Sequence, residues 1–81
     1  MIFIRHINNL IYTSDALNAS IYAFYPYCSI STEYLSETMI SVSVSVHHEY
    51  QRYAKEIALE FWNYFLDLSC QQKLENLNEP W

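Results

Sequence analysis

The sequence predicts an α+β fold: a small two-layer sandwich with the element order β-α-β-β-α, in which two helices lie on one face of an antiparallel sheet. Three observations predict it. The chain has 81 residues, of which 52% are apolar and 17% aromatic, as in a globular domain. Apolar residues alternate with serines in mid-chain, and the last third has helical periodicity. We expect a single α+β domain over residues 1–76 and a C-terminal tail over residues 77–81.

The first part of the chain predicts a strand followed by a short helix. The strand lies either at residues 2–6 or around residues 10–12, since the apolar residues alternate loosely in both places. The segment Thr13-Ser14-Asp15 then offers a helix N-cap, with an acid in the first turn, where the helix dipole favours it. The helix covers residues 15–25 and ends at Pro26, because proline disfavours a helical residue before it.

Two further strands are predicted at residues 27–32 and 38–46, with a loop at residues 33–37 between them. The second strand alternates valine or isoleucine with serine, so the sheet should have a β-branched inner face and a serine-rich outer face. That outer face is either solvated or covered by a partner or a second copy, or the edge strand accepts an extended peptide. The candidate contact residues for a peptide or partner are Ser41, Ser43, Ser45 and Tyr27.

The last third predicts one long helix over residues 50–74, which frays after Lys73. Leu59, Trp62 and Leu66 form an apolar ridge beside its main apolar stripe, and nothing local is available to cover that ridge. Surplus apolar surface is typical of a binding site, so we expect these three residues to form a partner interface. The main stripe should close over the sheet as core, and consists of Tyr50, Ala54, Ile57, Ala58, Phe61, Tyr64, Phe65 and Leu68.

Most of the eight tyrosines gather around the two predicted helices. Tyrosine combines an apolar ring with a polar hydroxyl, so it suits both half-buried core margins and interfaces, and both interpretations stay open. The residues concerned are Tyr12, Tyr22, Tyr25 and Tyr27 near the first helix, and Tyr50, Tyr53 and Tyr64 in the second.

Composition excludes several classes of function. Four cationic residues in a chain of net charge −5 are too few to follow a phosphate backbone, which disfavours nucleic-acid binding. No run approaches the ~20 apolar residues of a membrane span, and no signal-peptide core is present. We therefore expect a cytoplasmic protein. Its two cysteines, Cys28 and Cys70, should be free thiols, and neither is assigned a role. The chain has no glycine, and glycine-rich phosphate-binding loops are therefore excluded.

No group of residues indicates chemistry. His47, His48 and Glu49 are consecutive, and consecutive residues on a strand diverge instead of converging on a metal. The carboxylates of the long helix lie on a solvated face, and Cys70 has no histidine partner. We expect a chain that is not an enzyme, with no catalytic residue and no cofactor or metal.

One set of residues resembles a known family. The Thr-Ser-Asp segment after Tyr12, the apolar strand at residues 40–46, and the segment with Phe61, Asn63 and Asp67 resemble the HxsD-like family, small accessory proteins found beside radical SAM enzymes that modify ribosomally made peptides. The match covers residues 10–75, and its remaining matched positions are Phe24, Cys28, Ile30, Lys73 and Leu74. The family's basic position after Asp67 is not evident here, where serine, cysteine and two glutamines stand instead.

The resemblance implies a function as a non-catalytic accessory subunit. Its partners would be a larger radical SAM enzyme and that enzyme's ribosomal precursor peptide, which the subunit helps to recognise or present. The chain has no CxxxCxxC motif with which to hold an iron–sulfur cluster, so the chemistry would belong to the partner. The alternative is a standalone homodimeric regulatory or inhibitory protein, such as an antitoxin-like or phage-encoded one.

Overall fold

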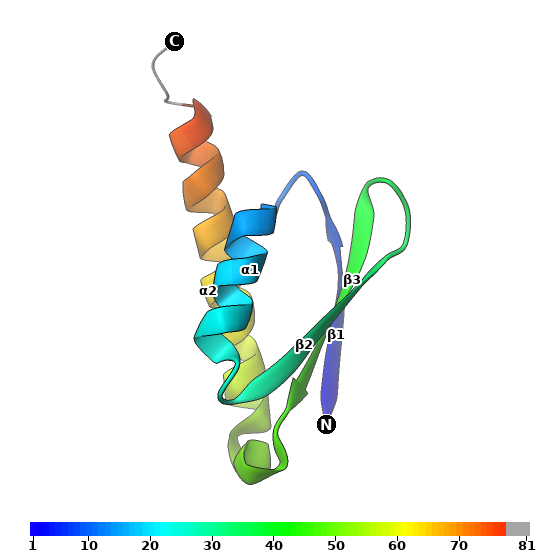
Figure 1. The fold of residues 1–81 in the computed structure, drawn as a ribbon, viewed down its shortest axis with the longest axis vertical. Helices are drawn as coiled ribbons and strands as arrows, with labels where there is room; N and C mark the ends of the chain where they lie inside the picture. Colours follow the sequence, from blue (N-terminus) through cyan, green and yellow to red (C-terminus); the bar gives the residue numbers. More distant parts are fainter. Residues whose placement is uncertain (78–81) are drawn as a thin grey trace.

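The predicted architecture is confirmed in the computed structural model, which describes residues 1–77 (Figure 1). A three-stranded antiparallel sheet forms one layer and two helices form the other. The predicted tail mostly lies outside the described residues, apart from Leu77, which ends the last helix. The elements are β1 (Ile2–Asn8), α1 (Ser14–Phe24), β2 (Cys28–Tyr34), β3 (Met39–Val46), a short 3-10 helix η1 (His48–Tyr53) and α2 (Ala54–Leu77).

The strand with the clearest alternation, β3, lies in the centre of the sheet, in the order β1-β3-β2. Val44 pairs with Phe3 of β1 and with Ile30 of β2, so these side chains form one row on the face toward the helices. On the opposite face Ser43 lies between Ile4 and Ser31. Register follows the burial pattern, because a slip of one residue would turn the valines into solvent.

The start of α1 is joined to α2 by hydrogen bonds. The Thr13 hydroxyl accepts the amide hydrogen of Ala16 at 3.1 Å, so the N-cap lies within the predicted Thr13-Ser14-Asp15 segment, at its first residue. The Thr13 amide donates to the Ser69 hydroxyl at 3.3 Å, and the Thr13 hydroxyl donates to the side-chain oxygen of Gln72. These bonds satisfy polar groups where the two helices meet, and Ser69 is fully buried.

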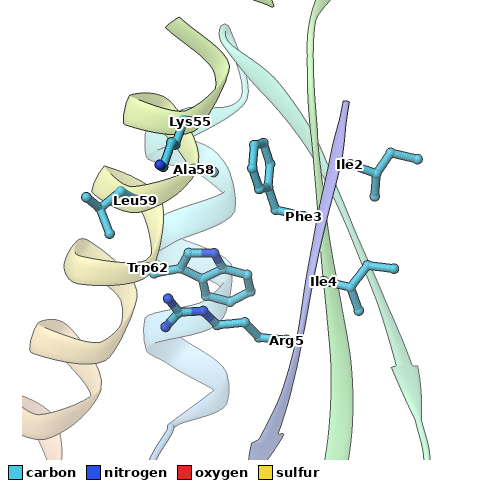
Figure 2. Close-up of a pocket in the computed structure, with 8 residues that line it drawn as sticks. All are labelled: Ile2, Phe3, Ile4, Arg5, Lys55, Ala58, Leu59 and Trp62. Atoms are coloured by element: carbon cyan, nitrogen blue, oxygen red, sulfur yellow. The ribbon is translucent and has the colours of Figure 1, made fainter.

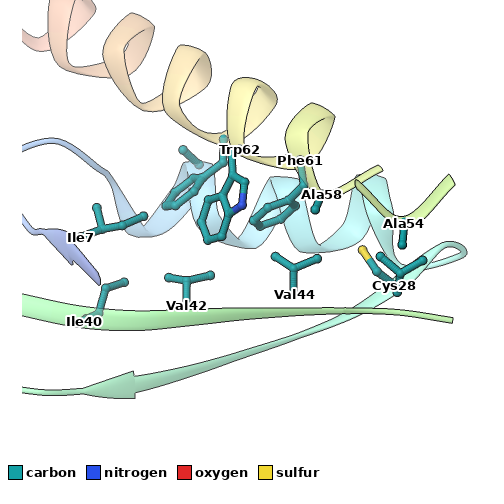
Figure 3. Packing of buried hydrophobic residues seen from close by; sticks show 12 residues of the cluster. Ile7, Cys28, Ile40, Val42, Val44, Ala54, Ala58, Phe61 and Trp62 are labelled. Atoms are coloured by element: carbon teal, nitrogen blue, oxygen red, sulfur yellow. The ribbon is translucent and has the colours of Figure 1, made fainter. Parts of the chain in front are cut away.

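The core lies between α2 and the inner face of β3 (Figure 3). Phe61 and Phe65 are completely buried against Val42 and Val44, as the predicted stripe requires. Alanines at Ala54 and Ala58 allow the helix to approach the sheet closely, and both are buried. Other stripe residues are less enclosed: Tyr50, Ile57 and Leu68 are half-buried, and Tyr64 is exposed.

The element boundaries differ from the predicted ones in four places. Helix α2 continues to Leu77, whereas the sequence predicted fraying after Lys73. The first strand is Ile2–Asn8 and excludes residues 10–12, because β3 offers a partner along the whole of that earlier segment. Strand β2 continues to Tyr34, where it pairs with Ile40, so the predicted loop begins two residues later. Finally, η1 precedes α2: the Gln51 side chain donates to the Val46 carbonyl at 2.7 Å and holds this first part as a tighter turn.

Candidate protein-binding surfaces

The predicted ridge of Leu59, Trp62 and Leu66 is not a continuous exposed surface. Trp62 is only 3% exposed and belongs to the hydrophobic core, with its ring centroid 5.2 Å from that of Phe61. The expectation that nothing local covers Trp62 is therefore wrong, and β1 is the reason. The Arg5 guanidinium lies 5.1 Å from the centroid of the Trp62 ring, a cation–π contact that the sequence did not predict. Leu59 stays 53% exposed, whereas Leu66 is half-buried against the core.

Beside Leu59 the structure has a groove between β1 and α2, with a volume of about 410 Å³. Figure 2 shows Phe3 and Arg5 directed from β1 toward α2, and Ile2 and Ile4 directed away from the helix. Two cations and no acid are among its lining residues. We call it the β1 groove, and its lining residues are Ile2, Phe3, Ile4, Arg5, Lys55, Ala58, Leu59 and Trp62.

The β1 groove exists because the two helices are placed over β3 and β2. Helix α1 packs on α2 and β2, and α2 packs on β3, which leaves β1 at the open side of the helical layer. Arg5 shares the inner face with Phe3 and Ile7, yet its side chain is exposed. Its aliphatic stem can lie along Trp62 while the guanidinium reaches solvent.

A second hollow, of about 420 Å³, lies on the other side of α2, where the end of α1 meets η1. Its aromatic side chains contact one another: the Tyr27 and Tyr50 ring centroids are 5.2 Å apart in an edge-to-face arrangement. Tyr53 is 54% exposed and Tyr27 42%. We call this region the tyrosine patch, which consists of Phe24, Tyr27, Tyr50, Tyr53 and Ile57, with Glu56 and Glu60 on its rim and Ala23 at its edge.

The serine-rich outer face of the sheet has the predicted composition. Ser41 is 9% exposed because His6 and Glu33 flank it on the neighbouring strands, and Ser43 and Ser45 are half-buried. No element within residues 1–77 covers this face (Figure 1). Tyr27 does not join the three serines, since its ring packs on Tyr50 in the tyrosine patch.

The polar side chains do not converge on a reaction centre in the described part of the chain. The His47 ring lies 3.3 Å from the Ser29 hydroxyl, while His48 and Glu49 are exposed on η1. Within residues 1–77 no three histidine, cysteine or acidic side chains are placed to hold a metal ion. Burial raises the pKa of the Cys28 thiol, which keeps this group protonated and poorly nucleophilic.

The residues that sequence reasoning missed are those of the β1 groove. Arg5 and Phe3 lie more than 50 positions from Trp62, so their contact depends on which side of α2 the first strand takes. The spacing of Lys55, Leu59 and Trp62 was the available signal, because residues at i, i+4 and i+7 share one side of a helix.

Comparison with protein-family models, with curated proteins and with solved structures found no match to this chain. The HxsD-like resemblance therefore stays a prediction from the sequence. Among the described helices, none combines the length and apolar character that crossing a bilayer requires.

Proposed function

We propose that this chain is a cytoplasmic, non-catalytic accessory subunit that binds a larger enzyme and helps to recognise or present that enzyme's peptide substrate. Following the resemblance, the enzyme is a radical SAM peptide-modifying enzyme and the peptide its ribosomal precursor. The observation that carries the proposal is the tyrosine patch: a group of partly exposed aromatic side chains around one hollow, on a domain with few charged residues.

Tyrosine-rich surfaces have a physical advantage in protein association. A tyrosine buries a large ring on binding, loses little conformational entropy, and keeps a hydroxyl that can form hydrogen bonds at the rim. The Tyr27 ring already packs edge-to-face on Tyr50, so less ordering of this side chain is needed on association. Glu56 and Glu60 give the patch an acidic rim, which fits a partner surface with basic residues.

Co-purification tests this proposal. The chain is co-expressed with the radical SAM enzyme encoded beside it, and the complex is isolated through a tag on the enzyme. We expect a complex with the wild-type chain and binding at least about tenfold weaker for Tyr53→Ala, because exposed tyrosines at interface centres are frequent energetic hot spots. Tyr34→Ala is the matched control: Tyr34 is 83% exposed but lies at the far end of β2.

Three results would contradict the proposal. The first is the absence of a radical SAM gene and a precursor gene beside this one. The second is a complex that Tyr53→Ala and Tyr34→Ala weaken equally. The third is a stable homodimer of the isolated chain in light scattering that Tyr53→Ala dissociates, since the patch would then be occupied by a second copy, as in the standalone regulatory alternative.

A further inference from the structure

Strand β1 has a free edge that the fold leaves unpaired. It is the first strand of the β1-β3-β2 sheet and pairs with β3 alone. The Asn9 amide donates to the Thr38 carbonyl at 2.8 Å, which sets the alternation of the antiparallel ladder. Phe3, Arg5 and Ile7 therefore direct their backbone groups toward β3, and Ile2, Ile4 and His6 direct theirs outward.

These outward groups have no other backbone partner within residues 1–77. At strand geometry, Ile2, Ile4 and His6 present donor and acceptor pairs about 7 Å apart, which is the spacing that an added strand requires. Unpaired edges are usually protected by proline, bulges, a covering loop or an inward-pointing charge. Strand β1 contains no proline, pairs continuously along its seven residues, and has the β1 groove beside it in place of a cover. Its one inward-pointing charge is Arg5, which disfavours an apolar or basic added strand and leaves an acidic one favoured.

The charges beside this edge select the kind of chain that can bind. Arg5 and Lys55 line the groove and are exposed, in a protein of net charge −5 with only four lysines and arginines. Neither forms any of the side-chain hydrogen bonds found among the described residues. On the opposite face of the edge, Ile2 and Ile4 are 62% and 59% exposed and offer apolar contacts.

We propose that β1 accepts an extended acidic peptide as a fourth strand of the sheet. Acidic side chains at alternate positions point into the β1 groove, where their carboxylates contact Arg5 and Lys55 and their stems lie on Leu59. The intervening β-branched residues extend the apolar row of Ile2 and Ile4. This inference rests on the proposed function only for the biological source of the peptide, which would be the precursor.

The other edge and a second copy of the chain fit less well. Strand β2 also has a free edge, but α1 covers its inner side, so no groove with paired cations lies beside it. A second copy would offer its own β1, whose one charged residue is Arg5, so it brings no carboxylate to the cations of the groove. An acidic strand satisfies both the hydrogen-bonding edge and the cations.

Fluorescence anisotropy tests this binding with a labelled seven-residue peptide in which glutamate alternates with valine, equal in length to β1. The control peptide has lysine in place of glutamate. Ile4→Pro removes an outward amide without breaking the β1–β3 ladder, and proline is tolerated at such edge positions. We expect Ile4→Pro to weaken binding of the glutamate peptide at least about tenfold. Thr32→Pro makes the same change on the free edge of β2 and should bind as the wild type does.

Two charge-reversal variants test separately whether the cations of the β1 groove contribute to binding. Lys55→Glu should weaken binding of the glutamate peptide about fivefold, whereas Arg52→Glu should not, although both change the net charge equally and both side chains are exposed. Circular dichroism confirms that each variant is folded.

Two results with the wild type would overturn the proposal: no binding of the glutamate peptide, or equal binding of the two peptides. Two results with folded variants would also overturn it: equal effects of Ile4→Pro and Thr32→Pro on binding, or equal effects of Lys55→Glu and Arg52→Glu. Self-association that Ile4→Pro abolishes would assign the edge to a second copy and also overturn it. Failure here is distinguishable from failure of the proposed function, because loss of peptide binding leaves enzyme capture through Tyr53 intact, and the reverse also holds.

Discussion

The two sides of α2 carry opposite charges and different shapes. Toward β1, Lys55 and Arg5 border a groove beside an unpaired strand edge. Toward α1, Glu56 and Glu60 border a hollow of tyrosine rings. Unpaired backbone groups of β1 border the first site, and exposed aromatic surface dominates the second.

This difference indicates two kinds of binding on one small domain. A strand edge recognises an extended chain through backbone hydrogen bonds, and side-chain chemistry then selects the sequence. A tyrosine surface recognises a folded partner by ring burial and shape. In the proposed function, one helix thus separates a site for an extended peptide from a site for a folded partner.

The largest effect is expected at Trp62, which lies under the β1 groove. Trp62→Ala should destabilise the domain by about 3–5 kcal/mol, because it empties a core position between Phe61 and Arg5. Leu59→Ala, on the exposed wall of the same groove, should cost less than about 1 kcal/mol. Urea unfolding followed by circular dichroism measures both, and equal costs would contradict the assignment of Trp62 to the core.

The second prediction compares the two arginine–aromatic contacts, one on each side of α2. Arg5→Ala should lower the free energy of unfolding by about 1 kcal/mol, since the guanidinium covers Trp62 at 5.1 Å from its ring centroid. Arg52→Ala should lower it by less than about 0.5 kcal/mol, because Arg52 lies 5.9 Å from the centroid of the exposed Tyr53 ring. A larger loss for Arg52→Ala would reverse this ranking of the two sides.

The smallest effect concerns Cys28, which lies beside Phe24 on the tyrosine-patch side of the molecule. Burial raises the pKa of its thiol above the usual 9.0, so the unfolded chain loses this proton at lower pH than the folded chain. Stability from this group is thus complete below pH 9 and declines as pH rises above it. Cys28→Ala should reduce the decline in unfolding free energy above pH 9, which urea unfolding of the variant and the wild type at a series of pH values measures. Identical slopes for the two proteins would contradict this assignment.

The fold could be predicted from local patterns, whereas the candidate sites depended on distant contacts. Alternation in residues 39–46 and a helix cap within residues 13–15 are local properties, and both appear as expected. The prediction that Trp62 is exposed was wrong for a physical reason. A helical projection shows which residues share one side of a helix, but it does not show which side will be covered by a strand from the other end of the chain. Phe3 and Arg5 supply that cover, so Trp62 of the expected interface is part of the core, whereas Leu59 stays exposed.

Amide hydrogen exchange along β1, measured with and without the glutamate–valine peptide, tests the central claim most directly. In the free protein the amides of Ile4 and His6 should exchange rapidly, because they point away from β3, and the peptide should slow both of them. The outward amide of Thr32 on β2 should stay fast in both states. Unchanged exchange at Ile4 and His6 in the bound protein, or protection at Thr32 instead, would contradict the account.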